Sequence, residues 1–193
     1  MPVDRVYIER FLEQHRNDIR GRALEVKEPL YVTQFGVDVT SCDILDNQPR
    51  NKRATIVADI SCAHSIPNDS FDCCVVTQTL QYVYDLQGAA RELHRILKPG
   101  GVLLATVPVL SRLDFETDYP EYWRFTPASY GRLFGTAFGP DRVTVQPYGN
   151  VLTAIAFLAG LAREDLSRDE LNAGDAYFPL VIGVRAVKAE PPS

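Results

Sequence analysis

The fold is decided by residues 70–108, SFDCCVVTQTLQYVYDLQGAARELHRILKPGGVLLATVP. Cys73–Val76 and Val102–Val107 are continuous apolar runs, as expected for strands that are covered on both faces. Between them Asp85 is placed to cap a helix in which apolar residues recur at intervals of three and four. We expect this helix to end at Lys98, because the proline that follows cannot continue it and the next two glycines let the chain turn back. The segment therefore predicts a strand–helix–strand crossover in a parallel sheet.

Apolar periodicity places further elements on both sides of this crossover. The expected strands cover residues 22–26, 39–44, 55–58, 143–147 and 180–187. One expected helix begins at an Asp4 cap and ends at Gly21, and another lies between Phe125 and Phe138, with Thr126 and Pro127 at its start. A third, Val151–Leu161, is strongly apolar but too short to span a bilayer, so we expect it to pack on the sheet or to form a dimer face. Alternating strands and helices predict an α/β protein with a parallel sheet.

Length and charge bound the class of protein. A chain of 193 residues, 46% of them hydrophobic, can bury one substantial core, so we expect a single domain over residues 1–189 and a disordered tail at 190–193. The net charge of -5 argues against a nucleic-acid partner, since phosphates are bound by clusters of Lys and Arg. The sequence has no signal peptide, lipidation motif or long apolar run, so we expect a cytoplasmic protein without a membrane partner. A small-molecule substrate is the expected partner.

The cysteines do not suggest a metal or redox site. Cys42, Cys62, Cys73 and Cys74 show no CxxC spacing, and the adjacent pair lies in an expected strand, where its side chains point to opposite faces. We interpret the four as buried free thiols. No other cluster of metal-ligating residues is evident, so we expect no metal.

Acidic residues follow the first three expected strands. Open α/β sheets bind ligands in a crevice beyond the carboxyl ends of their strands. Glu25 lies near the end of the first strand, Asp43 near the end of the second and Asp59 just after the third. Asp38 and Asp46 are alternatives to Asp43, because strand ends read from sequence are uncertain by a few residues.

The segments FDCCVVTQTLQYVYD (71–85) and ELHRILKPGGVLLATVP (92–108) resemble the fourth- and fifth-strand motifs of class I S-adenosylmethionine-dependent methyltransferases. The likeness is closest to type 11 methyltransferase domains and covers Arg22–Val109. It implies a Rossmann-like fold with a mostly parallel seven-stranded sheet flanked by helices and an antiparallel last strand. It also implies the cofactor S-adenosylmethionine and transfer of its methyl group to a small-molecule acceptor, such as a sugar or an aromatic hydroxyl.

The same resemblance implies roles for the acids. Glu25 would orient the amino-acid part of the cofactor, Asp43 would accept hydrogen bonds from the ribose, and Asp59 would contact the adenine amino group. A carboxylate suits the ribose because it offers two acceptor oxygens to two adjacent donors. The remaining residues expected at the cofactor are Ile60, Thr77 and Gln78.

One element departs from the family pattern. The first strand of the family opens into a glycine-rich turn, whereas here Val26 is followed by Lys27–Tyr31, which contains no glycine. Two hypotheses follow: a recast loop that still binds the cofactor, or a non-catalytic binding or interaction module that keeps the fold. The missing GxGxxG motif also argues against a nicotinamide-dependent dehydrogenase.

An aromatic and acidic segment, Leu113–Phe125, follows the fifth expected strand. Such a segment at the carboxyl edge can close over an acceptor or can serve as a packing flap. The side chains expected to contact an acceptor are Tyr119, Tyr122, Trp123 and Arg124. His64 is the candidate general base, and its alternative is a polar loop histidine.

Overall fold

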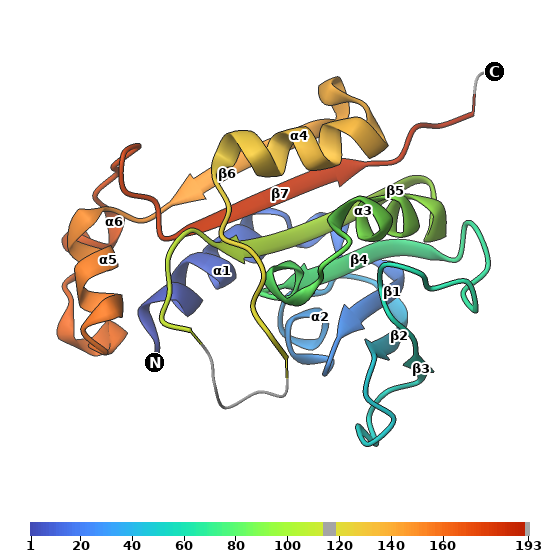
Figure 1. Cartoon of the computed structure of the whole chain (residues 1–193), viewed down its shortest axis with the longest axis horizontal. Coiled ribbons are helices and arrows are strands. Elements are labelled where there is room, and N and C mark those ends of the chain that lie inside the picture. Colours follow the sequence, from blue (N-terminus) through green and yellow to red (C-terminus); the bar gives the residue numbers. More distant parts are fainter. Residues whose placement is uncertain (114–118, 192–193) are drawn as a thin grey trace.

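The computed structural model describes residues 1–113 and 119–191. Within them a seven-stranded sheet has the order β3-β2-β1-β4-β5-β7-β6 (Figure 1). From β3 to β5 neighbouring strands are parallel, whereas β7 is antiparallel to both β5 and β6. The predicted Rossmann-like sheet with an antiparallel last strand is thus confirmed. The strands are β1 (Gly21–Val26), β2 (Val39–Asp46), β3 (Ile56–Val57), β4 (Phe71–Thr77), β5 (Leu97–Pro108), β6 (Val143–Tyr148) and β7 (Val181–Val187).

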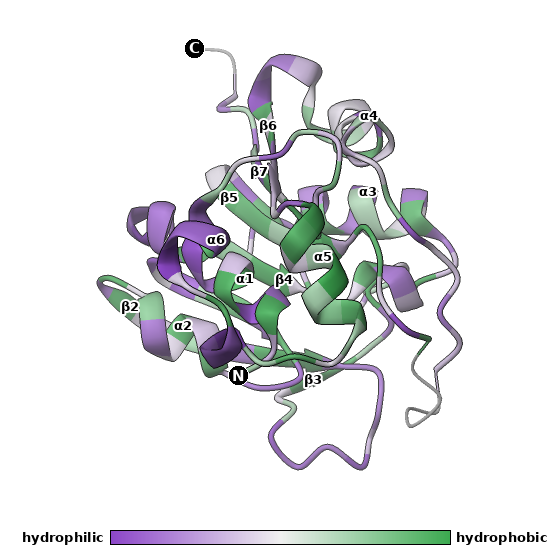
Figure 2. Ribbon diagram, turned by 90° about the vertical axis from the view of Figure 1, so that its left-hand side faces the viewer, coloured by the Kyte–Doolittle hydropathy of each residue, from purple (hydrophilic) through white to green (hydrophobic). Residues whose placement is uncertain are grey.

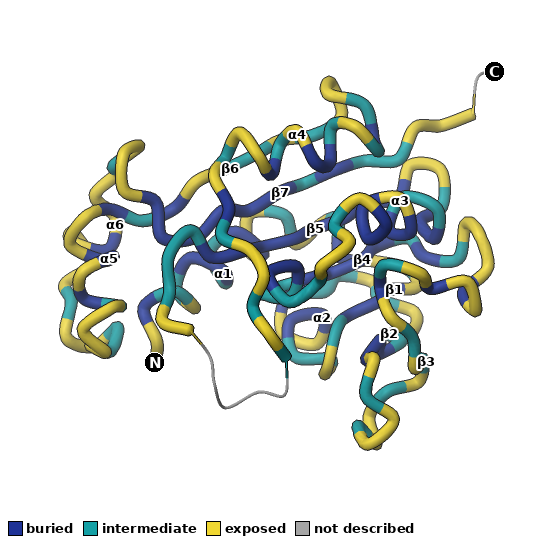
Figure 3. Tube along the Cα trace, in the orientation of Figure 1, coloured by how far each residue is buried: buried dark blue, intermediate teal, exposed yellow. Residues whose placement is uncertain are grey.

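Helices cover both faces of the sheet, and the strands between them are buried (Figure 3). On one face α3 and α4 share a core with the strands, to which Leu93 and Phe134 contribute. On the other face α1 and α2 pack through side chains such as Phe11 and Val32. The α-helices of the described residues are α1 (Val3–Gln14), α2 (Leu30–Phe35), α3 (Leu86–Ile96), α4 (Pro127–Phe138), α5 (Val151–Leu158) and α6 (Arg168–Asn172), with 3-10 turns at Arg16–Asp18, Leu80–Tyr82, Pro140–Arg142 and Arg163–Asp165.

The crossover β4–α3–β5 forms as the sequence predicts. The Asp85 side chain accepts the Gly88 N–H at 2.8 Å and so caps α3. The helix ends at Ile96, before the predicted Lys98, because Leu97 already pairs with Phe71 of β4. Helix and strand therefore join without a loop.

The two adjacent cysteines divide between the two faces, as expected. Cys73 belongs to the core beneath α1 and α2, and Cys74 to the core beneath α3 and α4. Burial raises the pKa of both thiols. The interpretation of all four as buried is wrong for Cys62, which is exposed on the loop after β3, and Cys42 is only half-buried.

Two differences in element ends matter for the site. The expected cap Asp4 instead lies in the first turn of α1, because the helix starts at the fully buried Val3, directly after Pro2. Strand β2 continues two residues beyond its expected end, because Leu45 and Asp46 pair with β3.

Residues 114–118 of the aromatic segment and 192–193 of the expected tail lie outside the described residues. Within the described parts of the chain, no helix is long and apolar enough to cross a membrane.

Candidate functional site

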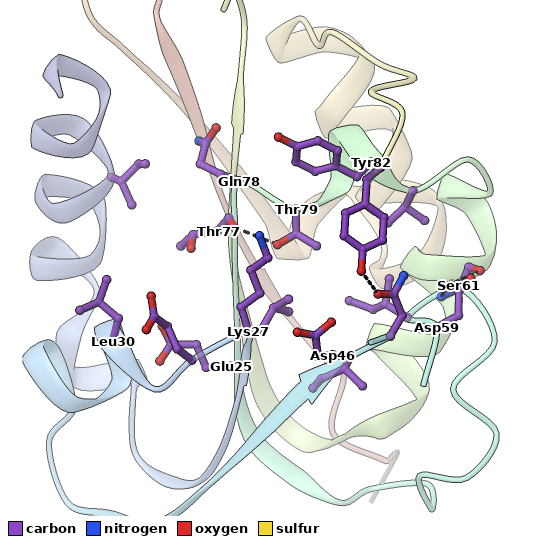
Figure 4. A pocket seen from close by; sticks show the side chains of 18 of the residues that line it. Glu25, Lys27, Leu30, Asp46, Asp59, Ser61, Thr77, Gln78, Thr79 and Tyr82 are labelled. Atoms are coloured by element: carbon purple, nitrogen blue, oxygen red, sulfur yellow. Dashed lines mark hydrogen bonds between the residues drawn. The ribbon is translucent and has the colours of Figure 1, made fainter. Parts of the chain in front are cut away.

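A cavity of about 820 Å³ lies at the carboxyl ends of the parallel strands (Figure 4). Its size falls within the range of small-molecule and cofactor sites, roughly 300–1,000 Å³. Four strand ends contribute to its wall: residues 25–26 at the end of β1, 45–47 at the end of β2, 58–61 after β3 and 77–79 at the end of β4. The cavity therefore occupies the crevice that the sheet topology predicts.

The described wall is rich in negative charge. Arg5 and Lys27 are its cationic side chains, whereas its carboxylates belong to Asp4, Glu25, Glu28, Asp46, Asp59 and Asp85. Opposite charges attract strongly where walls of low dielectric constant exclude water. The cavity therefore favours a ligand that carries positive charge.

Glu25 lies next to the last residue of β1, and its side chain reaches the first turn of α2. Its Oε1 accepts the Tyr31 N–H and its Oε2 accepts the Val32 N–H, each at 2.8 Å, so the carboxylate satisfies the first turn of this short helix. The residue is only 2% exposed. Burial raises the pKa of Glu25 to about 7, against the lowering effect of the two backbone donors. Near neutral pH this carboxyl group is thus close to its protonation midpoint.

The glycine-free turn keeps the backbone shape that a glycine would adopt. Lys27 has φ +71°, in the left-handed region, which costs a side-chain-bearing residue about 1–2 kcal/mol. Its N–H donates to the Leu45 carbonyl at 3.0 Å, and its own carbonyl accepts from Asn51 Nδ2 at 2.8 Å. Figure 4 shows the Lys27 side chain extending into the cavity, between Glu25 and Asp46. The turn therefore adds a cation where the family pattern has none.

Asp46 lies in the cavity wall, where Asp43 was expected. Asp43 is not in the described cavity wall; its Oδ2 accepts from Arg22 Nε and Nη2 at 2.9 and 2.8 Å, and its Oδ1 accepts from the Thr55 hydroxyl. Asp46, at the true end of β2, is 8% exposed and points into the cavity (Figure 4). Its oxygens accept from the Gln48 N–H and from Asn51, which fixes the carboxylate in place. The second acid of the cavity is therefore Asp46.

The other expected cofactor residues lie in the cavity wall. Asp59 is exposed, and its Oδ1 accepts both the N–H and the hydroxyl of Ser61 at 2.8 Å. Ile60 is buried and gives this end an apolar surface. Thr77 and Gln78 follow at the end of β4, where Gln78 adopts φ +46° and donates its N–H to the Thr106 carbonyl.

The four aromatic-segment candidates divide into two pairs. Tyr119 and Tyr122 line the cavity, and the Tyr119 hydroxyl donates to Asn47 Oδ1. Trp123 and Arg124 are not in the described wall. The Trp123 indole donates to the Val83 carbonyl at 2.9 Å, and Arg124 pairs with Glu121 at 2.8 Å, so both side chains fasten the segment to its surroundings.

His64 is also outside the described cavity wall. Its side chain is 81% exposed, and its Nδ1 lies 3.8 Å from Glu92 Oε2 on α3. This position matches the alternative of a polar loop histidine and supplies no base to the cavity.

A second cavity of about 240 Å³ adjoins the first. The two share the wall residues Asp4, Gln78, Tyr82 and Phe157. Gln81, 3% exposed, also lines the second cavity, and its Oε1 has no hydrogen-bond partner within the described structure. Asp4 and Phe157 come from α1 and α5, which meet only in the folded chain, so no sequence pattern marks them as site residues.

Comparison with known proteins gives one family match and many similar folds. Residues 21–105 match the type 11 family model, described as a methyltransferase domain. Over these residues the chain has the pattern of a type 11 methyltransferase domain. Such domains depend on S-adenosylmethionine, which is the cofactor that the family implies. No curated protein matches the sequence.

Solved structures resemble the fold of this chain over nearly its whole length. An S-adenosylmethionine-dependent methyltransferase of Archaeoglobus fulgidus is 13% identical with a TM-score of 0.62, covering 95% of this chain and 94% of its own. A putative one from Listeria monocytogenes is 11% identical with a TM-score of 0.61, covering 96% and 100%. A chain from the complex of the Haloferax volcanii Trm112 methyltransferase activator and the putative methyltransferase is 14% identical with a TM-score of 0.64, covering 98% and 92%. At these identities the likeness establishes the fold.

The residues of the larger cavity fit this cofactor. S-adenosylmethionine carries a sulfonium and an ammonium group, which suits the excess of carboxylates in the wall. Glu25 and Lys27 offer opposite charges to an amino acid's ammonium and carboxylate groups, and Asp46 offers acceptor oxygens to ribose hydroxyls. Asp59 and Ile60 combine an acceptor with an apolar surface, as an adenine requires.

Proposed function

We propose that this protein transfers the methyl group of S-adenosylmethionine to a small molecule that binds in the second cavity. The observation that carries the proposal is the junction of the two cavities at Gln78, directly after β4. The larger cavity has the volume and charge for the cofactor, and the smaller one has room for a compact acceptor. When bound, S-adenosylmethionine supplies a methyl group on a sulfonium that is already activated to leave.

The protein's contribution is then mainly alignment of the two reactants. Glu25, Lys27 and Asp46 hold the cofactor end of the cavity, as their charges and positions support. Gln78 and Tyr82 belong to both walls and border the place where the cofactor and the acceptor would meet. The apolar side chains Leu110, Phe157 and Leu180 exclude water from the acceptor.

The acceptor that these walls favour is a small hydroxyl compound. The second cavity combines apolar side chains with amides and with the charged residues Asp4, Arg112 and Glu121. Burial raises the pKa of Asp4 above its usual value, which makes its carboxylate a better proton acceptor. A sugar or aromatic hydroxyl would deliver its proton to an Asp4 oxygen as the methyl group is transferred.

The test is a methyl-transfer assay with labelled S-adenosylmethionine and a panel of sugars and phenols. We expect turnover of at least one hydroxyl acceptor. Asp4→Asn should lower turnover at saturating cofactor about 100-fold or more, the usual size of a general-base contribution. Asp85→Asn is the matched control, because Asp85 lines the larger cavity alone and caps α3. An equal loss of turnover in Asp4→Asn and Asp85→Asn would show that Asp4 is not the proton acceptor.

The second candidate function, a non-catalytic binding module, is favoured by the Lys27 side chain inside the cavity. A protein of this kind would bind the cofactor without turnover, or would not bind it. Cofactor binding combined with inactivity toward every class of acceptor would favour this candidate.

A further inference from the structure

Helix α5 turns its large apolar side chains outward. Its buried residues are the small Thr153, Ala154 and Ala156. Its exposed residues are large, and their exposed fractions are 42% for Val151, 41% for Leu152, 60% for Ile155 and 59% for Leu158. This arrangement of small buried and large exposed residues is the reverse of that in a surface helix of a monomer, which buries its largest apolar residues. Figure 2 shows the ribbon of α5 coloured mostly as hydrophobic residues.

The apolar surface continues beyond the helix. Leu161 is 45% exposed, and Tyr177 and Phe178 are 89% and 51% exposed. The Val151 N–H donates to Asp175 Oδ2 at 3.4 Å, which brings the segment that carries the two aromatic residues to the start of α5. We call the following set the α5 face: Val151, Leu152, Ile155, Leu158, Leu161, Tyr177 and Phe178.

The α5 face is held in a defined position. Asn150 caps α5 by accepting the Thr153 N–H at 2.9 Å, and its Nδ2 donates to the Glu170 and Ala173 carbonyls at 2.8 and 2.9 Å. After the helix, the Arg163 N–H donates to the Met1 carbonyl at 2.7 Å. A face anchored at both ends loses little conformational entropy when a partner covers it.

The area of the α5 face suits a stable interface. Aromatic side chains bury roughly 150–250 Å² each, and the smaller Val, Leu and Ile side chains of the face lie near the lower end of this range. Seven of them, about half exposed, present on the order of 500–900 Å². A standard interface buries about 800 Å² on each partner, whereas an ordinary monomer exposes apolar patches of only about 300–600 Å².

The charge of the α5 face indicates whether a lipid surface or a second copy of the chain covers it. Residues 151–162 contain no charged side chain, while the whole chain carries a net charge of -5. An acidic chain is repelled by anionic lipid surfaces, which attract helices with a basic polar face. Two copies related by a two-fold axis would bring the same uncharged surface together without repulsion between like charges. A second copy of this chain therefore matches the face in area and in charge.

We propose that the protein forms a two-fold symmetric homodimer in which the α5 face of one copy packs against the α5 face of the other. The interface buries Ile155 and Leu158 at its centre, since these are the most exposed residues of the helix. This proposal is independent of the methyl acceptor and of cofactor binding.

The test is the mass in solution, measured by light scattering after size-exclusion chromatography. We expect a dimer for the wild-type protein. Ile155→Lys and Leu158→Lys should each weaken dimerisation more than about tenfold, because each buries an unpaired charge in the interface. Val57→Lys is the matched control: Val57 is 51% exposed on edge strand β3, away from α5 in Figure 1, and its change should leave the dimer intact.

Circular dichroism and thermal melting show whether each variant is folded, since these side chains are exposed in one copy. A wild-type protein that stays monomeric up to about 100 μM would overturn the proposal, because an interface of this size gives at least micromolar affinity. A dimer that survives both α5 changes would overturn it as well. Flotation of a monomeric wild-type protein with neutral lipid vesicles would instead assign the face to a membrane surface.

Discussion

Oε1 of Glu25 accepts the N–H of Tyr31 at 2.8 Å, so an acid near the end of β1 also stabilises the first turn of α2. The other carboxylate oxygen does the same for the next residue. Both bonds lie beside the cavity, and burial raises the pKa of Glu25 to about 7. One carboxyl group thus links the shape of the glycine-free turn, the charge of the cavity and the stability of the fold.

The raised pKa predicts how stability depends on pH. The unfolded chain loses the Glu25 proton near pH 4.5, whereas the folded chain keeps it until about pH 7. The stabilisation is therefore fully present below pH 4.5 and is lost as the pH rises through 7, by about 1–3 kcal/mol. Urea denaturation of the wild type and Glu25→Gln at pH 5 and pH 8 measures it. We expect the variant to lose most of this difference; an equal pH dependence in both proteins would contradict the assignment.

The same group should couple cofactor binding to proton release. An ammonium group binds the Glu25 carboxylate but gains little from the neutral acid, so the affinity for S-adenosylmethionine should rise about tenfold from pH 6 to pH 8. Calorimetric titration in two buffers of different ionisation enthalpy measures the released protons. Glu25→Gln should abolish the release. A proton count of zero in the wild type would show that the ammonium group binds elsewhere.

Two neighbouring acids form a matched pair of variants. Asp46→Ala should weaken S-adenosylhomocysteine binding by about 1–3 kcal/mol, because it removes an acceptor from the cavity wall. Asp43→Ala should leave the affinity within about twofold and cost up to about 1 kcal/mol of stability, because Asp43 pairs with Arg22 at the surface. Calorimetry and urea denaturation separate the two effects. The reverse pattern would return the ribose role to Asp43.

Lys27 should bind the carboxylate end of the cofactor. Lys27→Met keeps most of the side-chain volume and removes the charge, so the affinity for S-adenosylmethionine should fall about tenfold. Binding of 5′-methylthioadenosine, which lacks the amino-acid end, is the control and should not change. Tighter binding of S-adenosylmethionine by the Met variant would instead mean that the lysine obstructs the cofactor.

The central layers of the fold were predictable because their signals are local. The apolar runs of β4 and β5 and the cap Asp85 lie within one short segment, and the structure confirms them. Helix α2 was missed, because its six residues follow Pro29 without a long apolar period and depend on the Glu25 carboxylate for their first turn. That support comes from tertiary structure.

The residues of the site could be predicted only where the ends of the strands could be predicted. A two-residue error in the end of β2 exchanged Asp43 for Asp46, because the crevice begins only past the last paired residue. Asp4 carried a signal for a helix cap and none for a site. Phe157 reaches the cavity from α5, more than a hundred residues away in sequence, and only the packing of α1 and α5 brings these two residues together.

The most direct measurement is a calorimetric titration of the purified protein with S-adenosylhomocysteine and S-adenosylmethionine, with Asp46→Ala as the control variant. We expect one site per chain for both ligands in the wild type and a weaker site in the variant. Absence of binding at millimolar ligand, in a protein shown to be folded by circular dichroism, would contradict the claim that the cavity beyond β1, β2 and β4 holds the methyl donor.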